Sequence, residues 1–450
     1  MDKQKKFHEL FIPIYIELFF MMLIGFADTT MLSAVGDKTV GAVGTSNTYI
    51  SIFTLAFNII CSGMTAVMTQ YIGAKKEHIA QKACQIGLVI NTIIGTIISL
   101  IFLIFARPIL VGMSISPALE EDAVVYTTLI GGSAILTAVT PIYSYHLRAF
   151  GRTKEPLITT LVANLVNIVF NAIFIYGLKM GVYGAAFATI ISRVINLVLN
   201  MVMSYIYIKK DNRVCEISNK VIISQIVKIG LPAALETGMY NVSMMLVMMM
   251  INKMDINGIN ATIKSYGSTI TQFACMSSVA IASANAIIIG WKCGEGKIEE
   301  CYKLTFKHCL FAIIFGMSVE LIVALLGYPI MSLMSKDSHI IKTVQIILFI
   351  DIALELGRAT NIVMGQALKC TGDALFTVII SILFTLLFAV GFTFIFGVQL
   401  KMFVIGSFIG LASDEIARGI CMMLRWKSRK WENKIFVKKT LDNLNKNENE

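Results

Sequence analysis

Long apolar runs, each about twenty residues in length, recur along the whole chain. A helix of that length crosses the hydrocarbon core of a bilayer, and only a helix satisfies its own backbone polar groups in lipid. The runs therefore predict an all-α polytopic membrane protein with twelve transmembrane helices. The predicted spans are 10–34, 46–70, 86–106, 123–145, 157–178, 182–208, 222–250, 265–289, 305–326, 340–365, 376–396 and 400–424.

Composition supports a membrane protein and excludes several other classes. Hydrophobic residues make up 56% and charged residues 15% of the 450 residues, against about 45–50% and about 25% in soluble domains. That balance excludes a disordered chain, a disulfide-rich secreted scaffold and nearly every ordinary soluble enzyme. The nine cysteines are scattered and form no CxxC pair, so we interpret them as free, mostly buried thiols.

The distribution of Lys and Arg predicts the orientation of the spans. Of 38 such residues, 27 lie on the side of the predicted spans that holds the N-terminus and eight on the other side. The remaining three, Arg193, Arg358 and Arg418, lie within spans. Because basic residues concentrate in cytoplasmic loops, we expect a multi-pass protein of the cell (inner) membrane with both termini cytoplasmic. The net charge of +10 is then a topology signal, and no nucleic-acid partner is expected.

The second half of the chain repeats the first. Pro13 and Glu17 match Pro232 and Glu236 at one shared offset, and three further landmarks keep nearly the same offset. Each half has six spans, an even number, so both halves enter the membrane from one side as pseudo-symmetric six-helix lobes. The predicted domains are an N-terminal lobe at 1–210, a cytoplasmic linker at 211–224, a C-terminal lobe at 225–425 and a basic cytoplasmic tail at 426–450.

An intramembrane carboxylate, Asp28, lies near the end of the first span, where a charge is costly and usually functional. Asn167 and Asn171 in the fifth span and Thr189 in the sixth lie at nearly the same depth. These oxygens suit a hard cation, and a buried carboxylate can instead bind a proton. We predict a cation-binding site at these four residues. Hydrogen-bonded helix contacts, or neutralisation of Asp28 by Arg193, are the alternatives.

Further ionisable residues lie in the predicted cytoplasmic halves of the spans. Glu355 and Arg358 are three residues apart, so they can form an ion pair along one helix. Asp414 and Arg418, four residues apart, can do the same. Glu236 lies near the middle of the seventh span and is a candidate proton or substrate site in the C-terminal lobe. The other residues, interpreted as a charged gating or structural network, are Glu17, Glu355, Arg358, Asp414, Glu415 and Arg418.

Catalytic and nucleotide-binding motifs are absent from the sequence. It contains no HExxH, no GxSxG and no Walker A loop. We therefore expect that the chain is not an enzyme, holds no cofactor or tightly bound metal, and uses an ion gradient as its energy source. A channel or a membrane-embedded enzyme would share the hydropathy. A channel would conduct without counter-transport, and an enzyme would need a nucleophile or metal cluster at one depth.

Several motifs resemble the multidrug and toxic compound extrusion (MATE) family. DTTMLSAVG lies at the end of the first span, QYIGAKKEHIAQKA follows the second, and LRAFGRTKEPLITTLVANLVNIVFNAIFIYG precedes GVYGAAFATIISR. ELGRATNIVMGQALKCTGDALF and DEIARGICMMLRWKSRKW look like a prokaryotic branch of the family. The resemblance covers residues 1 to about 431.

The resemblance implies a secondary active antiporter that exports amphipathic, often cationic, drugs or toxic compounds in exchange for H⁺ or Na⁺ by alternating access. It places the family's cation site on Asp28, Asn167, Asn171 and Thr189. Many members carry Asp where this chain has Asn171, so the single carboxylate argues against strongly bound Na⁺ and leaves a proton at Asp28 open. Some members use a Glu in the seventh span, but Glu236 lies nearer its proline than that pattern.

The resemblance also implies partners and an alternative. The expected partners are a small amphipathic substrate and the lipid bilayer, the expected state is a monomer, and the only ions expected are the transported ones. The alternative within transport is a lipid-linked oligosaccharide flippase of related architecture. Such a protein should line its cleft with several basic residues that meet phosphates.

Overall fold

The computed structural model describes residues 5–33, 37–112, 119–211, 213, 215–254, 259–438 and 440. This part of the chain is almost entirely helical and contains no β-strand. The chain divides into two compact units, Met1–Gly230 and Leu231–Glu450, called here the N-lobe and the C-lobe. The division falls inside one helix, α8 (Asn219–Lys253), while the finer domain bounds given above stay a prediction.

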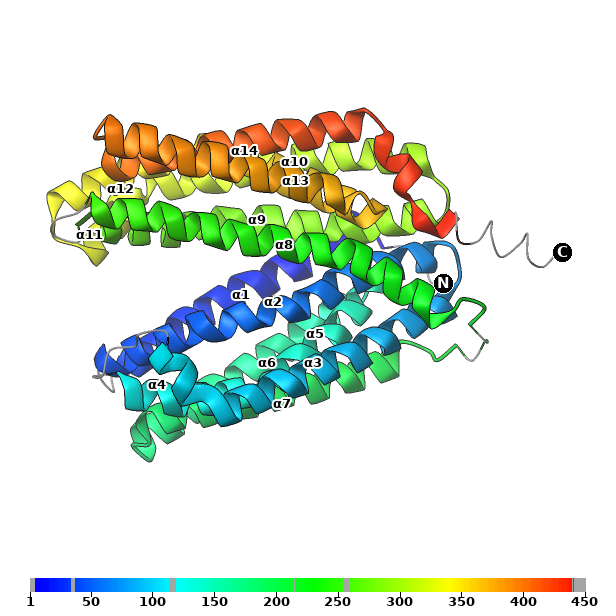
Figure 1. Cartoon of the computed structure of the whole chain (residues 1–450), viewed down its shortest axis with the longest axis horizontal. Helices are drawn as coiled ribbons and strands as arrows, with labels where there is room; N and C mark the ends of the chain where they lie inside the picture. Colours follow the sequence, from blue (N-terminus) through cyan, green and yellow to red (C-terminus); the bar gives the residue numbers. More distant parts are fainter. Residues whose placement is uncertain are drawn as a thin grey trace. The chain divides into compact units, whose positions relative to one another are not determined.

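The N-lobe is a helical bundle in which neighbouring helices run alongside one another (Figure 1). Two π-helical stretches interrupt its regular helices: Thr127–Gly131 leads into α5, and Ala172–Gly177 continues α6. Apolar side chains such as Phe102 and Ile130 pack between the helices and are completely buried. The helices are α1 (Phe7–Ser33), α2 (Asp37–Gly73), α3 (Glu77–Gly112), α4 (Glu120–Tyr126), α5 (Ala134–Ala149), α6 (Lys154–Asn171) and α7 (Gly181–Tyr207).

The C-lobe is a second bundle with its own apolar core, in which Val344 and Ile347 are completely buried. It begins within α8, and α12 packs against α9, α10 and α14. The other helices are α9 (Ile259–Gly294), α10 (Ile298–Leu325), α11 (Gly327–Met334), α12 (Ser338–Thr371), α13 (Ala374–Phe384) and α14 (Phe403–Lys427), with π-helical stretches at Thr385–Val390 and Thr393–Gln399 and a 3₁₀ turn at Lys430–Lys434.

Twelve spans follow from these helices. In the described ranges nine helices are long and apolar enough to cross a membrane, and a tenth span is the pair 120–131 and 134–149, bent by 43°. The two others, α12 and α14, have 34 and 25 residues and carry charged residues near their middles. Those charges are buried in ion pairs, described below, so both helices can span a bilayer. The predicted all-α fold of twelve spans in two six-helix lobes is confirmed.

The repeat between the lobes extends to individual backbone angles. Left-handed backbone is strained for residues other than glycine, so its positions mark local structure sharply. Four such positions in the N-lobe recur in the C-lobe at a nearly constant offset in residue number. The π-helical stretches that begin at Ala172 and Thr393 are separated by the same offset. The pairs are Lys75 with Gly296, Gly151 with Gly372, Lys179 with Lys401, and Gly181 with Phe403.

The segment after α14 packs on the C-lobe. The rings of Trp426 and Trp431 stack with 4.1 Å between their centroids, and both residues are completely buried. The indole nitrogen of Trp431 donates to the Trp426 carbonyl oxygen at 3.0 Å, which satisfies the one polar atom of the ring. Residues at the start of the predicted tail, 426–450, are therefore part of the packed C-lobe.

Candidate functional site

A cavity of about 500 Å³ lies in the N-lobe among α1, α5, α6 and α7. Asp28, Asn167 and Thr189 line it, so three of the four predicted cation-site residues face one space. The fourth, Asn171, contacts Asp28 directly from α6. Apolar side chains of α1 and α5, Leu18, Met21, Ile24 and Leu136 among them, complete the wall. Its size falls in the range of about 300–1,000 Å³ that small-molecule sites occupy.

Asn171 holds the Asp28 carboxylate in place. Its amide nitrogen donates to Oδ1 of Asp28 at 2.9 Å and to Oδ1 of Asn167 at 3.1 Å, which uses both amide hydrogens. The Asn171 side-chain oxygen is buried and has no hydrogen-bond partner among the described groups. Thr189 donates its hydroxyl hydrogen to the Ala185 carbonyl at 2.8 Å, within its own helix. Three of the predicted residues thus form one hydrogen-bonded chain beside Thr189.

Arg193 lines the same cavity. Within the described ranges no ion pair joins it to Asp28 or to another carboxylate. The ion pair by which Arg193 would neutralise Asp28 is therefore not formed in this structure. Besides Asp28 and Arg193, the cavity wall carries a second carboxylate and guanidinium, those of Glu17 and Arg148, several hydroxyl and amide groups and a set of apolar side chains. A wall of mixed polar and apolar groups suits an amphipathic molecule that carries charge.

Glu17 forms an ion pair in the N-lobe cavity, apart from the charged residues of the C-lobe. Nη2 of Arg148 lies 2.8 Å from Oε2 of Glu17, and the Thr160 hydroxyl donates to Oε1 at 3.3 Å. Glu17 is 4% exposed, so this pair is buried. The predicted network is thereby divided, because Glu17 pairs within the N-lobe while the other members lie in the C-lobe.

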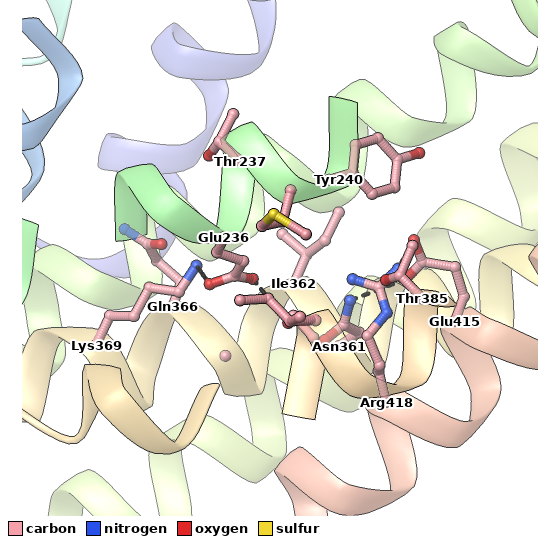
Figure 2. A pocket seen from close by; sticks show the side chains of 14 residues that line it. Glu236, Thr237, Tyr240, Asn361, Ile362, Gln366, Lys369, Thr385, Glu415 and Arg418 are labelled. Atoms are coloured by element: carbon pink, nitrogen blue, oxygen red, sulfur yellow. Dashed lines mark hydrogen bonds and ion pairs between the residues drawn. The ribbon is translucent and has the colours of Figure 1, made fainter. Parts of the chain in front are cut away.

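Glu236 lies in a second cavity, of about 300 Å³, within the C-lobe. Figure 2 shows its carboxylate facing Lys369, whose Nζ is 2.8 Å from Oε2. Ser381 donates to Oε1 at 3.1 Å and Thr377 donates to Oε2 at 3.5 Å. Glu236 is therefore an ion-paired acid surrounded by donors in this structure.

Arg418 and Glu415 line the same cavity as Glu236 (Figure 2). Nη2 of Arg418 lies 2.7 Å from Asp414 and 2.7 Å from Glu415, and the Asn361 amide donates to Glu415 at 2.9 Å. On α12, Arg358 lies 2.8 Å from Glu355. Both pairings expected along single helices are present, while their gating role stays a prediction.

The sequence interpretation misses three ionisable residues of the two lobes. Arg148 and Lys369 are predicted in loops, which is wrong: Arg148 lies in α5 and Lys369 in the last turn of α12. Their long aliphatic stems let a helix continue beyond its apolar run while the charge turns back to a carboxylate. The third, Glu320, is the lone acid in the apolar run 305–326, and that isolation is the signal that marks it. Asp351 of α12 also lies 3.4 Å from Arg358.

Comparison with known proteins gives a consistent result. The model of the MatE family matches residues 13–173 and 232–395. An uncharacterized transporter of Bacillus subtilis, YisQ, is 30% identical over 96% of this chain and 95% of its own length. A probable multidrug resistance protein of Thermotoga maritima, NorM, is 23% identical over 96% of this chain and 94% of its own.

Solved structures share the fold. A MOP superfamily transporter from Pyrococcus furiosus superposes with a TM-score of 0.84 at 22% identity, over 94% of this chain and 95% of its own. That protein is described as having a binding pocket of reverse polarity that suggests a different function. An outward-facing multidrug resistance MATE transporter gives the same TM-score and coverage. At this level of identity the likeness supports the twelve-span, two-lobe fold.

Proposed function

Because the chain belongs to the MatE family, whose members are transporters and not enzymes, we propose that it exports amphipathic, often cationic, drugs or toxic compounds. The export is driven by exchange for H⁺ or Na⁺ through alternating access. Relatives that match 96% and 85% of this chain are named probable multidrug resistance proteins. We further propose that it acts as a monomer in the cell membrane with both termini in the cytoplasm.

The observation that carries the proposal is the position of Asp28 on the N-lobe cavity wall. Its carboxylate accepts one hydrogen bond, from Asn171, and forms no ion pair with a described residue. A carboxylate in that state attracts either an external cation or a proton. An organic cation in the cavity and a proton on Asp28 would then compete for the same negative charge. Competition of this kind gives each ligand a different affinity in the presence of the other, which coupled exchange requires.

The ligands around Asp28 favour a proton over Na⁺. The amide of Asn171 points its hydrogens, not its oxygen, at Asp28 and Asn167. Na⁺ needs several converging oxygens, and Asp28 supplies the one carboxylate among the four residues of the predicted site. A single carboxylate braced by one donor can bind a proton without rearrangement of its neighbours.

The flippase alternative is less well supported by the cavity charges. A flippase should present unpaired basic groups to phosphates, but Arg148, Lys369 and Arg418 are each neutralised by a carboxylate within 2.8 Å. Arg193 is the cation of the N-lobe cavity for which no described acid is a partner. In the C-lobe, Lys264 lines a small cavity and likewise has no ion pair with a described acid. One such group in each lobe is fewer than an oligosaccharide diphosphate would require.

The proposal is tested in proteoliposomes loaded with a fluorescent organic cation, with a pH gradient and a Na⁺ gradient imposed separately. Wild type is compared with Asp28→Asn and with Glu121→Gln, which removes an exposed acid of α4. We expect efflux driven by the pH gradient, loss of that coupling in Asp28→Asn and none in Glu121→Gln. Full coupled export by Asp28→Asn would overturn the role of Asp28. Absence of efflux under both gradients, together with lipid translocation by the wild type, would favour the flippase.

A further inference from the structure

Glu320 on α10 is a buried acid that no part of the proposed function uses. The residue is 0% exposed, and neither carboxyl oxygen has a hydrogen-bond partner among the described groups. The charges that act on it most strongly are those of Asp351, Arg358 and Glu355, all on α12, which packs along α10. Glu320 therefore lies within the electrostatic reach of a cluster of buried charges without being hydrogen-bonded to any of them.

The one basic residue of this cluster, Arg358, already forms ion pairs with two of its acids. Arg358 lies 2.8 Å from Glu355 and donates to both oxygens of Asp351 at 3.4 Å. Glu355 also accepts from the Ser278 hydroxyl of α9 at 2.6 Å. Gly316, one turn before Glu320, allows this arrangement, because a Cβ there would lie 2.8 Å from Oε1 of Glu355. Two of the three carboxylates thus share one guanidinium, and Glu320 is left without a bond to it.

The charge balance requires a further positive ligand. If all three carboxylates were ionised, the cluster would hold two uncompensated negative charges, and each buried ion costs several kcal/mol in lost hydration. A metal ion is not the compensating ligand, since no three acidic, His or Cys side chains of the described residues converge around a point. A proton on Glu320 removes one of those charges and leaves both ion pairs of Arg358 intact.

Among the described residues, no cation of another helix forms an ion pair with Glu320, Asp351 or Glu355. From α9 come the Cys275 thiol and the Ser278 hydroxyl, and from α14 comes Glu415, a further acid. The short helix α11 has the sequence GYPIMSLM and brings no charge. Arg358 and Glu415 line a small cavity of about 140 Å³ together with Lys264, so water that reaches this cavity reaches the edge of the cluster.

The internal repeat carries none of these charges in the N-lobe. At the offset that relates Gly151 to Gly372, the N-lobe has Ser99, Ile130, Ala134 and Thr137 in place of Glu320, Asp351, Glu355 and Arg358. The equivalent helices of the N-lobe pack with Ile130 and Ala134 nearly or completely buried. The corresponding N-lobe segment is bent by 43° where α12 is one continuous helix, and it packs without a charge at any of the four positions. We therefore infer that the acids of the C-lobe serve another purpose than packing.

We propose that Glu320 is a proton-binding site of the C-lobe, held neutral between α10 and α12 and poised to exchange its proton when Arg358 moves from Asp351 toward it. The proton comes from water by way of the small cavity lined by Arg358, and no bond other than the carboxyl O–H forms or breaks. The role of Glu320 as a second coupling site beside Asp28 rests on the proposed function. The binding of a proton by Glu320 does not.

Infrared spectroscopy of the full chain in lipid tests the proposal, because a protonated carboxyl has a carbonyl stretch that an ionised one lacks. We expect this band in the wild type at neutral pH, its loss in Glu320→Gln, and its retention in Glu300→Gln, which removes a half-exposed acid of the same helix. Glu320→Asp keeps a carboxyl and should shift the band. An unchanged band in Glu320→Gln and Glu320→Asp would overturn the proposal.

Proton binding and transport fail separately in this design. The spectra need no substrate, so a missing Glu320 band would overturn this site even if Asp28-dependent efflux is found. Conversely, a band that Glu320→Gln abolishes would hold even if no organic cation is exported. Coupling is then measured as the number of protons moved per substrate exported at a fixed pH gradient. We expect this number to be smaller in Glu320→Gln than in Glu300→Gln.

Discussion

Glu17 and Glu236 occupy the same place in their two lobes and make the same contacts. Their basic partners, Arg148 and Lys369, are also related by the internal repeat. So are Thr160 and Ser381, whose hydroxyls donate to these acids. The repetition of acid, base and hydroxyl favours a structural role common to both lobes. The assignment of Glu236 as a proton or substrate site stays a prediction.

Removal of either acid should destabilise its lobe. Glu17→Gln leaves Arg148 buried without its partner, and Glu236→Gln does the same to Lys369, at a cost of about 3–5 kcal/mol each. The free energy of unfolding in detergent, followed by circular dichroism, measures the loss. The two losses should be similar because the two sites are equivalent.

The double variant Glu17→Gln with Arg148→Met provides the test of this explanation. It removes both charges, so most of the lost stability should return. Lys303→Gln, which breaks an exposed pair with Glu299 at 3.8 Å, should leave stability unchanged within error. A double variant as unstable as the single ones would show that packing, not the charge, accounts for the loss.

Asn171→Asp should introduce Na⁺ dependence. The new carboxylate would lie about as close to Asp28 as the present amide, whose nitrogen is 2.9 Å away. Two like charges at that separation require a cation between them or a shared proton. The thermal stability of Asn171→Asp should rise with added Na⁺ and not with added choline, whereas wild type and Asn171→Ala should respond to neither. An equal response of all three proteins would contradict the assigned geometry.

Gly316→Ala should disturb the buried charges on α12. The new methyl group would meet the Glu355 carboxylate, and displacement of that side chain weakens its bonds to Arg358 and Ser278. We expect a loss of about 1–3 kcal/mol in the free energy of unfolding. Gly238→Ala in α8 is the matched control, because a Cβ there meets nothing within 4 Å and should gain up to ~1 kcal/mol of helix propensity. Equal stability of both variants would refute the close approach.

Acid should loosen the segment between α7 and α8 in a defined range of pH. Hydrogen bonds from Arg213 lower the pKa of Asp211 to about 2 from an ordinary 3.8. A carboxyl whose pKa is lowered by folding stabilises the folded form fully above pH 3.8, and the effect is lost as the pH falls to about 2. Pepsin, active at low pH, should therefore cleave this segment increasingly from pH 3.8 downward.

The partner of Asp211 offers the control for that experiment. Arg213→Gln removes the hydrogen bonds that lower the pKa, so cleavage by pepsin should already be fast near pH 3.8. Lys210→Gln, an exposed lysine of the same segment, should behave as wild type. If Arg213→Gln follows the wild-type profile, the ion pair does not hold the segment.

Hydropathy and spacing predict much of this fold, because both act locally. An apolar run of sufficient length specifies a span without knowledge of its neighbours, and pairs such as Glu355 with Arg358 follow from one turn of helix. The depth argument likewise brings Asp28, Asn167 and Asn171 to one level, and the structure places them in hydrogen-bond contact.

What could not be predicted depends on contacts between distant helices. Arg148 and Lys369 lie beyond the ends of their apolar runs, so hydropathy assigns them to loops, while their acidic partners lie four helices away along the chain. The state of Glu320 depends on how Arg358 divides its bonds between two other acids. No pattern in the sequence reports that division.

The stacked pair Trp426 and Trp431 has a practical consequence for experiments on this transporter. The sequence contains three tryptophans, and the third, Trp291, is also buried in the same lobe. Intrinsic indole fluorescence therefore originates from one half of the molecule, with no contribution from the half that holds Asp28. A change of emission on acidification or on addition of a substrate would report a response of the C-lobe without any attached dye.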